Sequence, residues 1–119
     1  MSNCPLSRKA REKLARQQEI VAAARELFLR QDYHETTLEE IAHHAEFGKG
    51  TIYNYFASKE DLFLAICEQL ILEMEDIARR TLIESEGESR QRLTAYADSM
   101  IRYSRDNVKL ITLVMHRIH

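Results

Sequence analysis

The chain has 119 residues, among them three Gly, one Pro and two Cys. So few turn-forming residues argue against sandwiches, barrels and hairpin-rich folds, which need a turn about every 8–12 positions. Two cysteines make no disulfide framework, and no apolar run approaches the roughly 20 residues that span a bilayer. We therefore expect a small, soluble, cytoplasmic protein of the all-α class.

The net charge of −2 conceals an uneven distribution. Residues 1–30 carry seven Lys or Arg and three Glu, whereas residues 31–60 carry two Lys and six acidic residues. The basic segment from Arg8 to Arg16 has two interpretations, a solvated end or an arm that reaches a polyanion such as DNA. Charge alone does not choose between them.

Apolar residues at helical spacing predict a first helix that begins near residues 8–12 and ends at about residue 31. Asp32 then stands where the chain must turn. The run Thr37-Leu38-Glu39-Glu40 fits a capping box, which predicts the start of a second helix. This helix has an apolar stripe of only two turns, so it must pack on its neighbours to be stable.

Residues 46–50 are predicted to form a turn, and Thr51 to Phe56 a third short helix. Ser58 is the expected N-cap of a longer fourth helix that continues to about residue 82. Residues 84–89 read as a loop. A fifth helix follows, ending at Asp106-Asn107, and a sixth spans 108–118. The expected apolar stripe of the fifth helix is Leu93, Tyr96, Ala97, Met100 and Ile101.

Two short helices joined by a tight turn within residues 37–56 have the size of a helix-turn-helix. A recognition helix enters the major groove with its N-terminus first, so its opening residues must be small or able to form hydrogen bonds. Gly50 permits close approach, Lys49 offers a cation, and Thr51 offers a hydroxyl and a methyl group. Tyr53 and Tyr55 lie away from the expected core positions, where phenol hydroxyls can reach phosphates.

Lys59 is expected in the first turn of the fourth helix. A cation at that place opposes the helix dipole by about 0.3–1 kcal/mol, so the lysine needs another reason to be there. A DNA phosphate would supply that reason.

The run from Thr37 to Leu62, TLEEIAHHAEFGKGTIYNYFASKEDL, resembles the DNA-binding signature of TetR-type transcriptional regulators. The preceding segment Ala24-Arg-Glu-Leu-Phe28, with Tyr33 and Thr36, is similar too. The resemblance covers residues 14–66, and its most specific part is Gly-Thr-Ile-Tyr-Asn-Tyr-Phe-x-Ser-Lys-Glu, which begins at Gly50.

The resemblance implies a set of DNA-binding residues. These are Thr37 near a phosphate; Lys49, Gly50, Thr51 and Tyr53 at the bases or the adjoining backbone; Tyr55 and Lys59 on phosphates; and Asn54 at the groove, as in some relatives. It further implies a homodimer on a palindromic, double-stranded DNA operator, acting usually as a repressor. In this family a small-molecule effector in the C-terminal helical domain releases the DNA.

The sequence departs from the family pattern at the turns. Asp32 stands where relatives usually have Gly, and Glu46-Phe47-Gly48 replaces a usual Gly-Val-Ser. A left-handed backbone at Glu46 would cost about 1 kcal/mol. Gly48 is tolerated as an N-cap but lacks the hydroxyl that could touch a phosphate.

We accordingly expect a three-helix, helix-turn-helix head over residues 1–56, joined by the long fourth helix to a partial ligand-binding and dimerisation domain over residues 57–119. Relatives are usually longer, so we expect a fragment of a longer regulator, monomeric or weakly dimeric and a poor DNA binder by itself. A natural short form is the alternative.

Other interpretations compete with DNA binding. The pairs Glu39/His43 and Glu40/His44 have metal-ligand spacing, but they point in different directions and read as a solvated face. Neither a nucleophile–base pair nor a phosphate-cradling loop is present at useful spacing, so we expect no enzyme and no cofactor or metal. A helical module that pairs with a full-length regulator or another protein remains the main alternative. An enzyme fragment using His43 or His44 is the weaker one.

Overall fold

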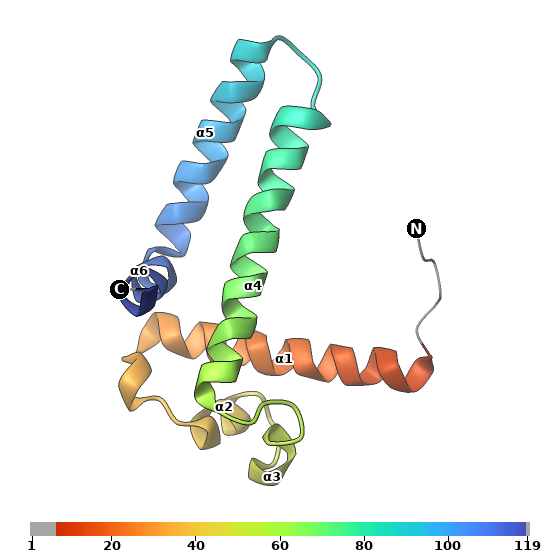
Figure 1. The fold of residues 1–119 in the computed structure, drawn as a ribbon, viewed down its shortest axis with the longest axis vertical. Helices are drawn as coiled ribbons and strands as arrows, with labels where there is room; N and C mark the ends of the chain where they lie inside the picture. Colours follow the sequence, from red (N-terminus) through yellow and green to blue (C-terminus); the bar gives the residue numbers. More distant parts are fainter. Residues whose placement is uncertain (1–6, 119) are drawn as a thin grey trace. The chain divides into compact units, whose positions relative to one another are not determined.

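The computed structural model describes residues 7–118, apart from the side chains of Lys49 and Ile118, and this part of the chain is helical without strands (Figure 1). The all-α class is confirmed. The elements in order are α1 (Arg8–Arg30), the 3-10 turn η1 (Tyr33–Glu35), α2 (Leu38–His44), α3 (Lys49–Ile52), α4 (Lys59–Ala78), the π-helical turn η2 (Arg79–Ile83), α5 (Ser89–Asp106) and α6 (Val108–Ile118). The chain divides into two compact units, residues 1–63 and 64–119.

Helix α1 begins and ends where its sequence indicates. The Ser7 hydroxyl accepts from the amide of Ala10 at 3.1 Å and caps the first turn. At the other end the amide of Gln31 donates to the Leu27 carbonyl at 2.8 Å, and the backbone then becomes extended. The buried residues of α1 are Ile20, Val21, Ala23, Ala24, Leu27 and Phe28.

Three aromatic rings form the centre of the first unit's core. The Tyr33 ring, supplied by η1, lies 4.9 Å from the Phe28 ring and 5.4 Å from the Phe63 ring, measured between centroids. Ile41 from α2 and Ile52 from α3 are fully buried in the same unit. The two short helices are thus anchored by tertiary packing, as their length requires.

The predicted bounds of the third helix, Thr51 to Phe56, are wrong. The α-helical turn begins two residues earlier, because Gly48 has extended backbone and acts as the N-cap. It ends at Ile52, where turn-like bonds take over. The amide of Asn54 donates to the Thr51 carbonyl and that of Tyr55 to the Ile52 carbonyl, each at 3.0 Å. The inward anchors are nevertheless right, since both Ile52 and Phe56 are buried.

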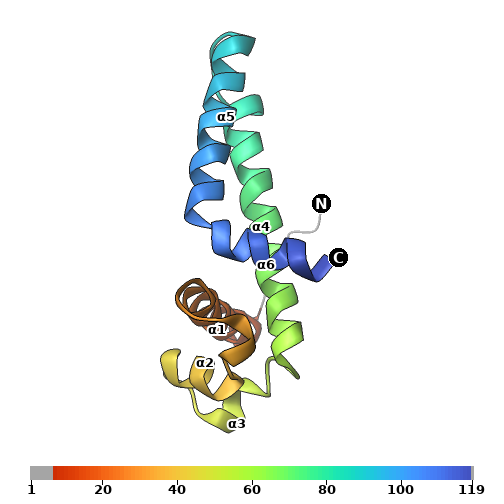
Figure 2. The same ribbon diagram turned by 90° about the vertical axis from the view of Figure 1, so that its left-hand side faces the viewer.

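In the second unit, α5 runs back beside α4 after the loop at residues 84–88 (Figures 1 and 2). Gly87 adopts φ +119°, a value that favours glycine, and so allows the reversal. The hydroxyl of Tyr103 on α5 donates to the Glu73 carboxylate on α4 at 2.7 Å. This bond ties the two antiparallel helices together.

The predicted apolar stripe of α5 lies largely exposed. Leu93 and Ile101 are 59% and 58% exposed, and Ala97 is exposed as well. Tyr96 and Met100 are half-buried. Helical spacing aligns apolar side chains on one face, but burial also needs a neighbouring element to cover that face.

The sixth helix, α6, has the predicted bounds, and Figure 2 shows it turned away from the direction of α5. The break between them is Asn107, whose side-chain amide donates to the Tyr103 carbonyl at 3.0 Å. Leu110 is fully buried. Within residues 7–118, no helix is both long and apolar enough to cross a membrane.

Candidate nucleic-acid interface

Helix α2 starts at a complete capping box. The Thr37 hydroxyl accepts from the amide of Glu40 at 3.1 Å, while the Glu40 carboxylate accepts from the amide of Thr37 at 3.2 Å. The side chain of Gln31 also donates to this carboxylate at 3.1 Å and so links the end of α1 to the start of α2. The bonds from Gln31 and from the Thr37 amide hold the pKa of Glu40 below its usual range.

The turn between α2 and α3 carries backbone strain. Glu46 adopts φ +63°, the left-handed conformation anticipated from its place in the motif. The amide of Phe47 then donates to the Ala42 carbonyl at 2.8 Å, which closes the end of α2. Gly48 caps α3 without a side-chain hydrogen bond, as its lack of a hydroxyl predicts.

The residues around α3 separate into an inward and an outward set. Ile52 and Phe56 are buried, whereas Tyr53 is 48% exposed and Asn54 is exposed. Thr51 and Tyr55 are half-buried. The side chain of Lys49 lies outside the described part of the structure, so its role stays a prediction.

Gly50 is exposed on α3 and faces open space. A Cβ atom built on it meets nothing within 4 Å, and its backbone has no positive φ that would demand glycine. The fold of this unit therefore gives no reason for a glycine at this position. A surface that approaches α3 from outside is a reason.

Lys59 has a structural contact that sequence reasoning missed. Its ammonium donates to the carbonyls of Tyr33 at 2.7 Å and Thr36 at 3.1 Å, and it lies 4.3 Å from the centroid of the Tyr33 ring. These contacts offset the unfavourable helix dipole. No sequence pattern connects Lys59 with Thr36 or Tyr33, which lie 23 and 26 positions earlier in the chain. The unfavourable place of a cation in the first turn of a helix indicated only that Lys59 needed a partner. The two carbonyls take two of the three N–H donors of the ammonium, and the third could still bond a phosphate. The phosphate contact of Lys59 therefore stays a prediction.

One histidine of α2, His44, joins a polar cluster on α1. His44 Nε2 lies 3.3 Å from a carboxylate oxygen of Glu26 and 3.3 Å from a guanidinium nitrogen of Arg30. Arg30 and Glu26 are themselves paired at 3.1 Å. Among the described residues, no three His, Cys, Asp or Glu side chains are arranged to hold a metal ion.

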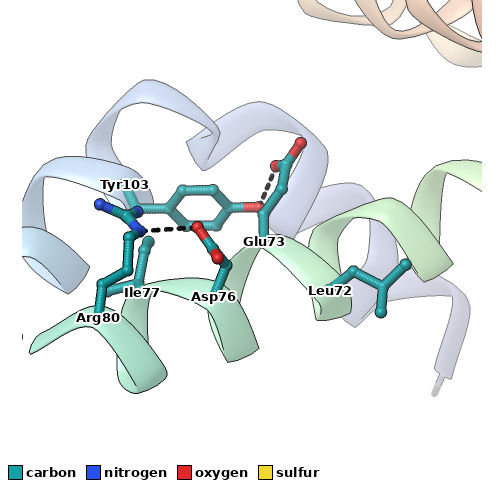
Figure 3. Close-up of a pocket in the computed structure, with 6 residues that line it drawn as sticks. All are labelled: Leu72, Glu73, Asp76, Ile77, Arg80 and Tyr103. Carbon is teal, nitrogen blue, oxygen red and sulfur yellow. Dashed lines mark hydrogen bonds and ion pairs between the residues drawn. The ribbon is translucent and has the colours of Figure 1, made fainter. Parts of the chain in front are cut away.

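Two hollows lie in the second unit. One is lined by Leu72, Glu73, Asp76, Ile77, Arg80 and Tyr103, and Figure 3 shows Arg80 paired with Asp76 and Tyr103 bonded to Glu73. The bond from Arg80, 2.7 Å long, is the main cause that lowers the pKa of Asp76. The other hollow, of about 270 Å³, is mostly apolar and is lined by residues of α4, α5 and α6. Cys67 lines it, and burial raises the pKa of this thiol.

The capped α2, the strained turn and the exposed α3 reproduce the layout of a helix-turn-helix, and residues 20–66 match the tetR family of bacterial regulatory proteins. This segment belongs to the tetR family. The resemblance noted from the sequence is thereby confirmed. The tetR family is one of DNA-binding regulators rather than of enzymes.

Curated relatives carry the same segment. The chain is 30% identical over 88 residues to the HTH-type transcriptional activator FasR of Mycolicibacterium smegmatis, which covers 74% of this chain and 40% of FasR. It is 39% identical over 66 residues to the HTH-type transcriptional regulator HbdR of Aromatoleum sp., covering 55% of this chain and 29% of HbdR. With the HTH-type transcriptional regulator QacR of Staphylococcus aureus it shares 45% identity over 47 residues, 40% of this chain and 25% of QacR.

Proposed function

We propose that this tetR-family chain is a sequence-specific, DNA-binding transcriptional regulator that reads a double-stranded operator with α2 and α3. Family membership over residues 20–66 and the names of the relatives support this role. The observation that carries it is Gly50, an exposed glycine on α3 that the fold does not require. A duplex whose base edges approach α3 closely would require it.

The residues around Gly50 have the chemistry that such an approach needs. We assign Lys49, Gly50, Thr51, Tyr53 and Asn54 to the bases and the adjoining backbone, and Thr37, Tyr55 and Lys59 to phosphates. Tyr53 supports the assignment because a large ring is half exposed beside α3 instead of packed in the core. The phosphate contacts fix the register of the protein on DNA, and the groove contacts select the sequence.

We further propose that the regulator acts in the cytoplasm as a homodimer on a palindromic operator and that a small-molecule effector releases it. Four large apolar side chains of α5 and α6 are exposed and suit a partner surface: Leu93, Ile101, Val108 and Met115. The apolar hollow of the second unit suits an effector. The chain spans about 25–40% of the length of these three relatives.

Repression is the sign of regulation that we propose, by exclusion of the polymerase from an operator within a promoter. FasR carries the name of an activator, so the opposite sign is a real alternative. A reporter gene behind the selected operator distinguishes the two. Reporter output should rise when the chain is deleted, and a fall would assign activation.

The substitution Gly50→Ala tests the DNA-binding proposal. Alanine fits the open space and favours helix, so the free energy of unfolding should stay the same or rise by up to about 1 kcal/mol. Affinity for a duplex selected from a random-sequence pool should fall about tenfold or more, the cost of about 1.4 kcal/mol of lost contact. Fluorescence anisotropy measures the affinity, and Glu68→Ala on the exposed face of α4 is the control.

The protein-interaction alternative gives a different result. If α2 and α3 bind protein instead of DNA, log affinity for the duplex will not depend on log salt concentration, and Tyr53→Ala will leave it unchanged. The proposal of a DNA-binding regulator predicts a negative slope of log affinity against log salt concentration, because phosphate contacts release counterions.

A further inference from the structure

We infer that three cations on the N-terminal half of α1, Lys9, Lys13 and Arg16, form a second phosphate-binding surface for the same DNA duplex. This surface, called the α1 stripe below, would contact the backbone beside the groove that α3 reads. The inference rests on the proposed function and adds a part of the interface outside residues 20–66.

The first half of α1 projects from the core of its unit. Burial along the helix begins at Ile20, and residues 8–19 are exposed except for Ala10 and Gln17, which are half-buried. Twelve helical residues extend about 18 Å at a rise of about 1.5 Å each. Residues 8–19 therefore form more than three turns of helix that contribute little to the core.

The α1 stripe lies on the face of the helix that packs farther along. Lys9, Lys13 and Arg16 stand at i, i+4 and i+7, and the same spacing continues to Ile20 and Leu27, which are buried. Residues so spaced share one face. In its C-terminal half this face of α1 is buried in the core of the unit that contains the helix-turn-helix. The stripe therefore continues, beyond the core, the face by which α1 joins that unit.

The helix-turn-helix itself has more acidic than basic residues, so a cationic surface beside it would favour DNA binding. Residues 37–63 contain five acidic residues and only two lysines. One of these, Lys59, already donates to two backbone carbonyls. A duplex is a dense polyanion, and attraction to its phosphates supplies much of the affinity. Residues 8–16, with five bases against one acid, supply the positive charge that residues 37–63 lack.

The arrangement of the cations also opposes the stability of the isolated helix. Lys9 and Lys13 are like charges at i, i+4, which repel each other. Helix α1 has no acidic residue in its first turn, where cations oppose the dipole. An external anion relieves both effects. Arg8, on another side of the helix, is paired with Glu12 at 3.2 Å.

The test compares two double variants of the full chain with the same loss of charge. Lys13→Gln/Arg16→Gln removes two cations of the stripe, and Arg8→Gln/Arg11→Gln removes two exposed cations from the other sides of α1. Both are measured by fluorescence anisotropy on the selected duplex at several salt concentrations. Circular dichroism checks that both keep the helix content of the parent chain.

The stripe variant should lower the slope of log affinity against log salt by about 1.8, which is about 0.9 for each phosphate contact, and the control should lower it much less. Trimming the base pairs that flank the half-site should weaken the parent chain but not the stripe variant. Equal loss in both variants, or no loss in either, would overturn the inference. So would a stripe variant that loses binding to phosphatidylserine vesicles but keeps the DNA slope, because the stripe would then bind membrane.

Failure of the inference and failure of the proposed function give different results. If the parent chain shows a steep salt slope that the stripe does not affect, only the inference is wrong. If the parent chain shows no salt-dependent binding to any selected duplex, both are wrong.

Discussion

Lys59 connects the first turn of α4 to the segment that follows α1. Its ammonium bonds two carbonyls in residues 33–36 and lies over the ring of Tyr33, which is itself buried. The residue that the motif assigns to a phosphate therefore also holds the core of its unit together. If the proposed phosphate contact forms, recognition and folding share this side chain.

Replacement of Lys59 by alanine should affect both roles. The free energy of unfolding should fall by about 1–2 kcal/mol, because two charge-assisted hydrogen bonds are lost from a half-buried site. If the third N–H reaches a phosphate, the salt slope for DNA binding should also fall by about one. Chemical denaturation and anisotropy measure the two effects. A lower stability with an unchanged salt slope would restrict Lys59 to the structural role.

Glu46 stores strain in the turn of the helix-turn-helix. Its φ of +63° is unfavourable for any residue with a Cβ atom, by about 1–2 kcal/mol. The substitution Glu46→Gly should therefore raise the free energy of unfolding by about 1 kcal/mol. Glu39→Gly, at an exposed position inside α2, should lower it by about the same amount. Urea denaturation measures the free energy of unfolding of both variants. A loss of stability in Glu46→Gly would show that the backbone at Glu46 is not strained.

At the scale of the element, α2 depends on a cap whose strength varies with pH. The pKa of Glu40 is lowered in the folded chain by its bonds to Gln31 and to the Thr37 amide. A carboxyl group with a lowered pKa stabilises the folded state at neutral pH, and this contribution is lost as the pH falls through the folded pKa.

The variant Glu40→Gln isolates this contribution, because glutamine can keep the capping geometry without the charge. The parent chain should be more stable than Glu40→Gln at neutral pH, and the difference should vanish in acid below the usual range of a glutamate. Thermal denaturation at a series of pH values measures the difference. A difference that stays constant with pH would show that the ionised carboxylate has no special role in the cap.

The elements also show how far local patterns determine this fold. Periodicity located α1, the capping box at Thr37 located α2, and the break at Asp106-Asn107 located α6, because these signals act through neighbours a few residues away. The same reasoning misplaced α3, which begins after the Gly48 N-cap and gives way to turn-like bonds beyond Ile52. The π-helical turn η2 was not anticipated either.

At the scale of the whole molecule, the two units divide the proposed work between DNA reading and control. The head contains the helix-turn-helix, and the second unit contains two hollows and several exposed apolar side chains. The residues proposed to read DNA and those proposed to bind an effector or a partner lie in different units. A dimer on DNA would couple these two roles.

Selection of duplexes from a random-sequence pool tests the dimer. Two copies that pair on DNA should recover inverted half-sites whose centres lie about 34–36 Å apart or a multiple of that distance, because each α3 enters a major groove on the same side of the duplex. Sequencing of the selected pool reveals the symmetry. Recovery of single, unpaired half-sites would mean that the chain binds as a monomer.

The sequence by itself determined the helical class, most of the helix bounds and the family, because these depend on side chains that are close along the chain. The open space around Gly50 and the attachment of Lys59 to residues 33–36 were decided only by tertiary structure. The same holds for the exposure of the α5 stripe. Each of these features depends on which segment, distant in the sequence, packs against the residue. A local sequence pattern does not contain this information.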